Sequence, residues 1–345
     1  MKEYTISDKA SLLEALRAIN ELSDAGLTLF VENDEHQIIG TLTDGDIRRC
    51  LLANGKLSDQ VAVAMKREFS FFLDSERDNI EKFRAFKSRN INLVPVLNCE
   101  QRLVAIYDLR KMKSMLPVDA VLMAGGKGER LRPLTEKTPK PLLPVGDKAI
   151  IDYNVERLID YGIKHISVTV NYLKEQIEDH FKEPQNGVLI NCVREPKYLG
   201  TIGSVKFVDN FYNDSVLLMN SDLFTNINYE DFYLHFIEND ADMSVAAVPY
   251  TVTIPYGIFD LRGRNIQGIQ EKPVYNLYAN AGIYLIKRKL LELIPNDTFF
   301  NATDFIDLLI QNKSKVIRFP LIGYWLDIGK HEEYKKAQEL ALHIK

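Results

Sequence analysis

Residues 118–146, VDAVLMAGGKGERLRPLTEKTPKPLLPVG, combine the residue types that bind a chain of phosphates. The first seven residues, 118–124, are almost wholly apolar, which predicts a buried strand. Glycines then let the backbone turn sharply and bring bare N–H groups against phosphate oxygens. There are three of them within four positions: Gly125, Gly126 and Gly128. Fixed positive charge comes from Lys127, Arg130, Arg132 and Lys140. The stretch therefore predicts a polyphosphate site at the end of a strand.

Two familiar phosphate-binding loops do not fit this stretch. The P-loop requires Lys-Ser or Lys-Thr after its last glycine, where this chain has Glu129-Arg130. The dinucleotide fingerprint requires its third glycine three residues after the second, and Gly128 follows Gly126 too closely. The stretch instead resembles the signature of the sugar-1-phosphate nucleotidyltransferases, GGxGxRLxPLTxxxPKPxxPV, a family that includes the mannose-1-phosphate and glucosamine-1-phosphate enzymes. The resemblance implies a nucleotidyltransferase domain over residues 117–345.

The resemblance also implies roles for residues of this loop. Arg130 is expected to hold the β- and γ-phosphates of a nucleoside triphosphate, and Lys140 to neutralise its α-phosphate. The backbone around the glycines is expected to bind the nucleotide, at Ala124, Gly125, Gly126 and Gly128.

Two aspartates are candidate metal ligands. Asp222 follows the apolar run Val216–Met219, and a charge there is costly unless it emerges at a site. Taken alone, Asp222 is as readily explained by a helix N-cap or a turn. Asp327 lies in YWLDIG (324–329), which matches the family pattern W-x-D-x-G and contains the single tryptophan. The resemblance implies Mg²⁺ at both aspartates, and carboxylates with phosphate oxygens suit that ion.

Three short segments carry candidate sugar-binding residues. They are PYGIFDL with Tyr256 and Gly257, IQEKP with Glu271 and Lys272, and NAGIYLI with Asn280. The resemblance implies that these residues hold the sugar hydroxyls and that Lys272 takes a catalytic part by neutralising the sugar phosphate. In isolation, Glu271-Lys272 would be interpreted as a solvated charge pair on a loop. The identity of the sugar is not readable from the sequence.

The segment REPKYLGTIG (194–203) is where the family recognises the base, and it contributes Glu195, Gly200 and Thr201. Uridylyl- and thymidylyltransferases of the fold place a glutamine five residues before the glycine, where this chain has Glu195. A carboxylate accepts from the neighbouring N1–H and N2–H₂ donors of guanine, whereas uracil presents an acceptor beside its donor. The sequence therefore predicts GTP as donor. The alternatives are that Glu195 faces solvent while backbone near Gly200 reads the base, and that the donor is UTP or dTTP.

The elements that must position these residues alternate between helix and strand. Patterns predict helices over 147–161, 173–181, 203–211 and 331–344, and strands over 165–171, 187–193, 215–224 and 280–286. This alternation is typical of a mostly parallel mixed sheet, in a Rossmann-like α/β fold whose ligands gather at the carboxyl ends of strands.

The segment 1–116 contains an internal repeat. Residues 27–52 and 92–116 each predict strand, turn, strand and helix, with Gly40 of the first copy aligned with Ala105 of the second, and each follows an amphipathic helix. So short a repeat needs a partner copy to bury its apolar face. The segment resembles a tandem CBS (α+β) module, which implies a regulatory domain with an adenine nucleotide at Thr43 and Asp46. Asp108 and Lys111 replace these residues in the second copy, so one nucleotide site is expected. The alternative is that Asp46 only caps a helix from Ile47.

Composition restricts the remaining choices. The chain has 345 residues, 46% of them hydrophobic, and a formal net charge of −5, which does not favour a nucleic-acid or membrane surface. Its three cysteines are far apart, which favours a reducing cytoplasm. The expected enzyme converts GTP and a sugar 1-phosphate to a GDP-sugar for surface polysaccharide or glycan biosynthesis, as a homo-oligomer joined through its CBS modules. A non-catalytic nucleotide sensor of the same fold is the alternative from another class.

Overall fold

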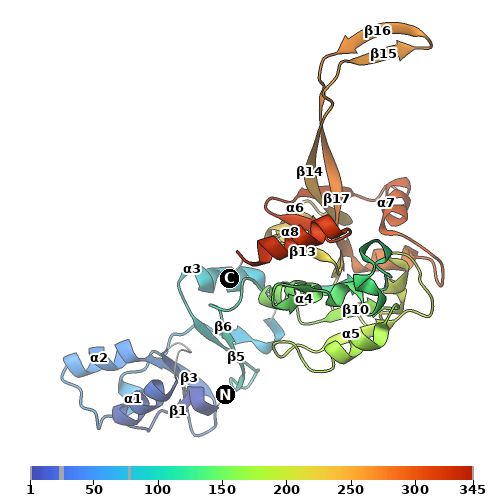
Figure 1. The fold of residues 1–345 in the computed structure, drawn as a ribbon. Helices are drawn as coiled ribbons and strands as arrows, with labels where there is room; N and C mark the ends of the chain where they lie inside the picture. The colour runs from blue at the N-terminus through green and yellow to red at the C-terminus, as the bar shows by residue number, and fades with distance from the viewer. Residues whose placement is uncertain (1, 23–26, 77–78, 344–345) are drawn as a thin grey trace. The chain divides into compact units, whose positions relative to one another are not determined.

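The computed structural model describes residues 2–22, 27–76 and 79–343. The chain divides into two compact units, Met1–Leu116 and Pro117–Lys345, which we call the N-terminal and C-terminal units (Figure 1). No helix in the described part of the chain is both long enough and apolar enough to cross a bilayer.

The N-terminal unit consists of two halves with the same topology. The first half contains β1 (Thr5–Ser7), α1 (Leu12–Glu21), β2 (Thr28–Glu32) and β3 (Ile38–Thr43); the second contains β4 (Phe72–Leu73), α3 (Ile80–Ser88), β5 (Leu93–Leu97) and β6 (Leu103–Asp108). In both sheets the first strand is parallel to the second, and the second is antiparallel to the third. The alignment of Gly40 with Ala105 carries β2 onto β5 and β3 onto β6, residue for residue. The predicted internal repeat is therefore confirmed, while its identity as a CBS pair stays a prediction.

The two halves bury apolar surface against each other. Each half has its own core, and a further cluster of Phe30, Ile38, Leu93 and Leu97 joins β2 and β3 of the first half to β5 of the second. The backbone N–H of Ile38 also donates to the carbonyl of Gln101 at 2.9 Å. This packing is what a short repeat requires, because one copy alone cannot cover its apolar face.

The two halves differ after their last strand. In the first half α2 (Asp44–Leu52) follows β3 directly, as predicted. The prediction of a corresponding helix within 92–116 is wrong, since β6 is followed by a turn and then by irregular chain. The Leu109 N–H donates to the Asn92 carbonyl at 2.8 Å, and Leu109 and Met115 are buried in the core of the second half. Burying both apolar side chains along this short segment takes precedence over local helix formation.

The C-terminal unit is built on a seven-stranded mixed sheet, ordered β11-β10-β7-β12-β17-β14-β18. Its strands are β7 (Val118–Met123), β10 (Ile166–Val170), β11 (Ile190–Arg194), β12 (Ser215–Asn220), β14 (Met243–Thr253), β17 (Val274–Lys287) and β18 (Val316–Pro320). Only β17 runs antiparallel to its neighbours, β12 and β14. The other neighbouring pairs are parallel, so the predicted mostly parallel mixed sheet is confirmed.

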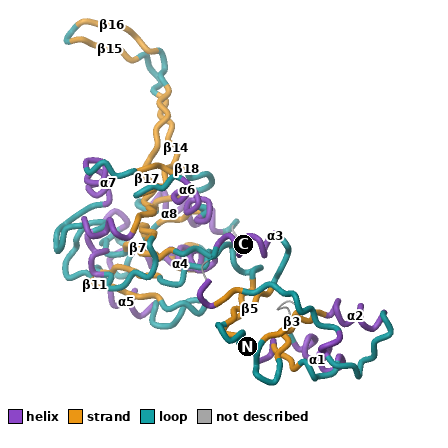
Figure 2. Tube along the Cα trace, turned by 180° about the vertical axis from the view of Figure 1, so that it is seen from behind, coloured by secondary structure: helices purple, strands orange, loops and turns teal. Residues whose placement is uncertain are grey.

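Five α-helices accompany this sheet in the described part of the unit (Figure 2). They are α4 (Ile150–Asp160), α5 (Lys174–His180), α6 (Tyr229–Glu238), α7 (Ala302–Gln311) and α8 (His331–Ala341). Phe305 and Leu309 of helix α7 are buried in the same apolar cluster as Val216 and Leu218 of β12. The helix predicted over 331–344 ends at Ala341, and Ile344 lies outside the described residues.

Two predictions in this unit are wrong in detail. The helix predicted over 203–211 is a short 3₁₀ helix, Gly203–Phe207, and the N–H of Gly203 donates to the Phe300 carbonyl. The strand predicted over 215–224 breaks after Asn220, because Ser221 and Asp222 leave the sheet; β13 (Leu223–Thr225) then pairs with β19 (Trp325–Asp327). The break places Asp222 at the carboxyl end of β12.

Strands β14 and β17 continue past the sheet as a two-stranded ribbon. Their ladder runs from Ala247 opposite Asn280 to Thr253 opposite Val274, and the hairpin of β15 (Ile258–Arg262) and β16 (Asn265–Gln270) follows. We call residues 248–280 the arm. Figure 1 shows it in orange, projecting from the rest of the C-terminal unit.

Candidate active site

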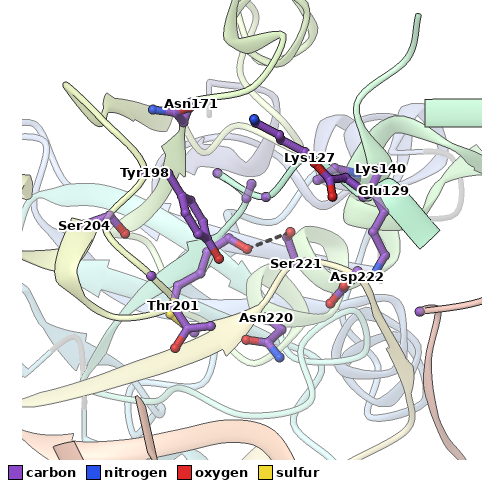
Figure 3. Close-up of a pocket in the computed structure, with 18 of the residues that line it drawn as sticks. Lys127, Glu129, Lys140, Asn171, Tyr198, Thr201, Ser204, Asn220, Ser221 and Asp222 are labelled. Atoms are coloured by element: carbon purple, nitrogen blue, oxygen red, sulfur yellow. Dashed lines mark hydrogen bonds and ion pairs between the residues drawn. The ribbon is translucent and has the colours of Figure 1, made fainter. Parts of the chain in front are cut away.

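A pocket of about 590 Å³ lies at the carboxyl ends of β7 and β12 (Figure 3). It gathers residues predicted for phosphate, base and metal binding from distant parts of the sequence. Those that line it are Ala124, Gly125, Gly126, Gly128, Arg130, Lys140, Glu195, Gly200, Thr201, Asp222 and Asp327. Their roles stay predictions, but the fold brings all eleven to one cavity.

The glycine loop is shaped by its two tightest positions. Gly128 has a φ of 62°, and a Cβ there would lie 2.9 Å from the Thr135 side chain. The Thr135 hydroxyl donates to the Gly128 carbonyl at 2.8 Å, which fixes the turn before the 3₁₀ helix Glu129–Leu131. At Gly125 a Cβ would overlap a carboxylate oxygen of Glu195. Glycine is needed at both positions, because a side chain at Gly128 would clash with Thr135 and a side chain at Gly125 would displace Glu195.

Asp222 and Asp327 lie together because β13 pairs with β19, with Leu223 opposite Asp327. The Lys140 ammonium forms an ion pair with Asp222, and its Nζ is 3.9 Å from an oxygen of Asp327. Burial and the nearby Asp222 carboxylate raise the pKa of Asp327, while Lys140 and Arg130 lower it. Two carboxylates in this proximity favour a cation between them.

One atom of this pair is left for a further ligand. Oδ1 of Asp222 is buried and has no hydrogen-bond partner among the described residues. Hard carboxylate oxygens are the donors that Mg²⁺ prefers, so the residues present fit that ion. No group of three or more histidine, cysteine or acidic side chains with metal-binding geometry occurs in the described part of the chain. A cation at the aspartate pair would therefore complete its shell with substrate oxygens and water.

Arg130 approaches Asp327 from the loop. A Cβ on Gly329 would lie 3.1 Å from its guanidinium, so the absence of a side chain at Gly329 leaves room for it. Arg130 also lowers the pKa of Asp327 through its charge. Two cations, Arg130 and Lys140, thus flank two carboxylates at one end of the pocket, an arrangement suited to phosphate groups bound with a metal ion.

Glu195 lies inside the pocket, only 4% exposed. One carboxylate oxygen accepts from the Leu199 N–H at 3.2 Å, and the Asn171 side-chain amide donates to the Glu195 carbonyl at 3.3 Å. Burial raises the pKa of Glu195 to about 7, against a partial lowering by the Leu199 N–H. The alternative in which Glu195 faces solvent does not fit this burial.

The raised pKa predicts a pH-dependent stability. A carboxyl that binds its proton more tightly in the folded state stabilises the fold below its unfolded pKa, near 4.5, and this stability is lost as pH rises to about 7. The difference between the folded and the unfolded pKa of Glu195 corresponds to about 3 kcal/mol in the free energy of unfolding. Glu195→Gln should flatten the stability profile between these pH values, measured by chemical denaturation at several pH values. An unchanged profile would mean that Glu195 ionises freely in the folded protein.

The candidate sugar-binding residues are not brought to the pocket. Tyr256, Gly257, Glu271 and Lys272 lie on the arm, where a Cβ on Gly257 would be 3.0 Å from the Glu271 carboxylate. Asn280 lies at the arm's base; its amide donates to the Tyr284 hydroxyl, and its oxygen accepts from the Gly282 N–H, both at 2.9 Å. None of these candidates lines the pocket.

The pocket also contains polar residues that the sequence analysis did not single out. They are Asn171, Tyr198, Ser204, Asn220 and Ser221, all labelled in Figure 3. The Ser221 hydroxyl donates to the Met123 carbonyl at 2.9 Å and so joins the ends of β12 and β7. Asn171 and Asn220 could have been found, because each is a polar residue at the carboxyl end of an apolar strand.

A second pocket, also of about 590 Å³, lies within the N-terminal unit. It is lined by Leu27, Thr28, Thr43, Asp44, Gly45, Asn92 and Arg110, which come from both halves of the repeat. Thr43 is the N-cap of α2 and Asp46 its third residue; the Asp46 carboxylate accepts from the Thr43 hydroxyl at 2.6 Å and from Arg49 at 2.6 Å. Asp46 is therefore part of the cap, although Thr43 and not Asp46 is the N-cap residue. Binding of a ribose at these residues stays a prediction.

Comparison with known proteins gives one family match. The family model described as nucleotidyl transferase matches residues 119–343. A protein of Sulfolobus acidocaldarius with the provisional name mannose-1-phosphate guanyltransferase is 30% identical over 232 residues, which are 66% of this chain and 64% of that protein. The D-glycero-alpha-D-manno-heptose 1-phosphate guanylyltransferase of Aneurinibacillus thermoaerophilus is 27% identical, over 66% of this chain and 99% of that protein.

A solved structure gives a similar comparison. HddC from Yersinia pseudotuberculosis is 25% identical with a TM-score of 0.50, and the match covers 65% of this chain and 99% of HddC. The chain covers a smaller share of the first curated relatives. It spans 64% of the S. acidocaldarius protein and 54% of the GlmU protein of Methanocaldococcus jannaschii. The family match lies within the C-terminal unit.

Proposed function

The chain belongs to the nucleotidyl transferase family, and from that premise we propose that it makes a nucleotide sugar and pyrophosphate from a nucleoside triphosphate and a sugar 1-phosphate. One observation carries the proposal. Arg130, Lys140, Asp222 and Asp327 converge beside the glycine loop in a single pocket. The names of the relatives, several of which are sugar-1-phosphate guanylyltransferases, support the same reaction class.

The reaction needs no covalent enzyme intermediate. A phosphate oxygen of the sugar 1-phosphate attacks the α-phosphorus in line, and the bond from the α-phosphorus to the bridging oxygen of the leaving pyrophosphate breaks. Catalysis is then positioning and charge stabilisation. The loop amides at 125–128 and Arg130 hold the β- and γ-phosphates, and Lys140 leaves Asp222 to neutralise the α-phosphate. Asp222 and Asp327 would hold Mg²⁺, which supplies charge neutralisation of the phosphates when bound.

We propose that the nucleotide is GTP. The support is Glu195, whose carboxylate lies within the pocket and is suited to accept from the two adjacent donors of guanine. HddC has also been solved in complex with GMP-PN, a guanine nucleotide. The product is then a GDP-sugar for the biosynthesis of surface polysaccharide or glycan. The enzyme acts in the cytoplasm. UTP and dTTP are the competing donors.

A pyrophosphate-release screen tests the proposal. The full chain with Mg²⁺ is assayed with four nucleoside triphosphates against a panel of hexose, amino-hexose and heptose 1-phosphates. We expect release with GTP and at least one sugar phosphate. Binding of nucleotide without release for any sugar phosphate would favour the non-catalytic sensor, the second candidate.

We further propose that the N-terminal unit is a tandem CBS module that binds an adenine nucleotide and joins chains into an oligomer. Its support is the repeat and the pocket that Thr43 shares with Thr28 and Asn92. Calorimetry on the full chain should detect binding of AMP, ADP or ATP outside the active site, still present when the active-site pocket is saturated with GTP.

The matched variant is Asp46→Ala, which should abolish this binding because it removes the carboxylate that accepts from the Thr43 hydroxyl. Because the lost cap also costs about 1 kcal/mol, Ser11→Ala, which removes the equivalent cap of α1, serves as control and should keep the binding. Absence of binding at millimolar nucleotide would leave the unit a structural element.

A further inference from the structure

Tyr198 is the one aromatic residue among those that line the active-site pocket in the described part of the chain. It follows Glu195 by three positions, and Figure 3 shows its side chain pointing into the pocket. The side chain is 48% exposed, so much of its ring is open to a bound molecule. Aromatic rings bind nucleobases by stacking, because every base has a flat π-face. A ring in this place is therefore suited to contact the base of a nucleotide.

The chain turns back at Glu195 and so holds Tyr198 beside the carboxylate. The Leu199 N–H donates to a Glu195 carboxylate oxygen at 3.2 Å, and Tyr198 directly precedes Leu199. Burial and the charge of Glu195 raise the pKa of the Tyr198 hydroxyl, which agrees with a short separation of the two groups. A carboxylate that accepts from the edge of a base lies in the plane of that base. The face of the base is then presented to a neighbouring side chain, and Tyr198 is the aromatic neighbour.

Phe299 packs against Tyr198 from outside the pocket. The two ring centroids are 5.8 Å apart and the ring planes are inclined by 64°, an edge-to-face arrangement that aromatic pairs prefer. Such a contact leaves at least one face of the Tyr198 ring uncovered by Phe299. Phe299 is not among the residues that line the pocket, so it can hold Tyr198 without touching a nucleotide bound there.

The segments that carry the two rings, 197–203 and 297–302, are joined through their backbones. The Phe300 N–H donates to the Leu199 carbonyl at 2.9 Å, directly after the two rings in sequence. A Cβ on Gly200 would lie 2.6 Å from the Phe300 carbonyl oxygen, so the segments also pack closely. Immobilising a side chain on binding costs free energy, and a ring that is held in advance avoids part of this cost.

We propose that the Tyr198 ring stacks on the base of the bound nucleoside triphosphate and that Phe299 positions this ring. The inference rests on the proposed function, because it takes the base to lie at Glu195 and the phosphates at the glycine loop. Stacking requires only the flat face of a base, whereas Glu195 accepts from its edge. Tyr198 therefore sets how tightly the nucleotide binds, and Glu195 sets which base is accepted.

The first experiment measures binding without turnover. Calorimetry on the full chain with Mg²⁺ and no sugar 1-phosphate compares GTP with tripolyphosphate, which has the phosphates and no base. UTP replaces GTP if wild type binds UTP more tightly. Tyr198→Leu should bind the nucleotide about ten- to a hundredfold more weakly than wild type, the range expected for loss of one stacked base. Its affinity for tripolyphosphate should equal that of wild type.

Two further variants identify the ring as the group responsible. Tyr198→Phe keeps the ring and should bind the nucleotide as wild type does. Tyr212→Leu removes a tyrosine that is exposed but does not line the pocket, and it should also bind as wild type does. Unchanged nucleotide binding in Tyr198→Leu would overturn the inference, as would an equal loss of tripolyphosphate binding. A loss in Tyr198→Phe as large as in Tyr198→Leu would overturn it too, because the hydroxyl would then be the contact.

The second experiment tests the part of Phe299. Phe299→Ala should weaken nucleotide binding, by less than Tyr198→Leu does, and Phe299→Tyr should bind as wild type does. The double variant Tyr198→Leu with Phe299→Ala should bind no more weakly than Tyr198→Leu alone, because Phe299 acts through Tyr198. Losses that add in the double variant would refute the positioning role of Phe299.

These measurements separate failure of the inference from failure of the proposed function. A wild type whose nucleotide binding depends on Tyr198, but which releases no pyrophosphate with any sugar 1-phosphate, would refute the proposed reaction and leave the stacking residue standing. A wild type that releases pyrophosphate while Tyr198→Leu binds the nucleotide normally would do the reverse.

Discussion

Asp222→Asn and Asp327→Asn are each expected to lower turnover by about three orders of magnitude while the fold is retained. A bound divalent cation contributes several kcal/mol of charge stabilisation to phosphoryl chemistry. A factor of ten in rate corresponds to about 1.4 kcal/mol. Asp222 has a buried carboxylate oxygen without a hydrogen-bond partner among the described residues. Asp327 pairs across β13 and β19 with Leu223, the residue that follows Asp222. Either amide removes a charged ligand from the cation. Steady-state pyrophosphate release at saturating Mg²⁺ measures the effect.

The control for the metal prediction is Asp307→Asn, on the exposed side of α7. It should behave as wild type. A second readout is the rise in melting temperature on adding Mg²⁺ with nucleotide, which should disappear in the Asp222 and Asp327 variants. Full activity in both of these variants would refute the assignment of the metal ligands.

Glu195→Gln is expected to reverse the choice of base. The glutamate carboxylate accepts from both donors of guanine, whereas a glutamine amide offers one donor and one acceptor, as uracil requires. A polar edge left wrongly paired in a buried site costs orders of magnitude in discrimination, and Glu195 is buried. The ratio of kcat/KM for GTP to that for UTP should therefore fall at least a hundredfold. It is measured with the same sugar 1-phosphate for both donors.

The pKa of Glu195 adds a dependence on pH to this prediction. Because burial raises that pKa to about 7, the carboxyl is neutral below this pH and ionised above it. The preference for GTP should therefore rise as pH increases through about 7 in wild type and stay flat in Glu195→Gln. Glu183→Gln, at an exposed position, is the matched control and should keep the wild-type ratio. If GTP is preferred equally in wild type and Glu195→Gln, guanine is correct and the carboxylate is not the reason.

Local sequence patterns determined the first strand of the C-terminal unit, the glycine loop after it and the internal repeat of the N-terminal unit. The apolar run 118–124 and the glycines after it predict a strand and a phosphate loop, since both depend on residue types within one short stretch. The internal repeat follows from similar apolar spacing at a constant offset. In these places, local preference and tertiary packing favour the same structure. Where they differ, as after β6, burial of Leu109 and Met115 prevails over the predicted helix.

The pairing of distant residues was decided by tertiary structure alone. The sequence suggests a role for Asp222 and for Asp327 separately, but only the β13–β19 ladder and the ion pair with Lys140 bring the two carboxylates together. The burial of Glu195, which sets its pKa, depends on the close approach of Gly125 from another strand end. Strand patterns report alternation along a chain and not where a ladder ends, so they do not place Glu271 on a projecting ribbon. Contacts between segments far apart in sequence, and the desolvation that they impose, exist only once the chain is folded.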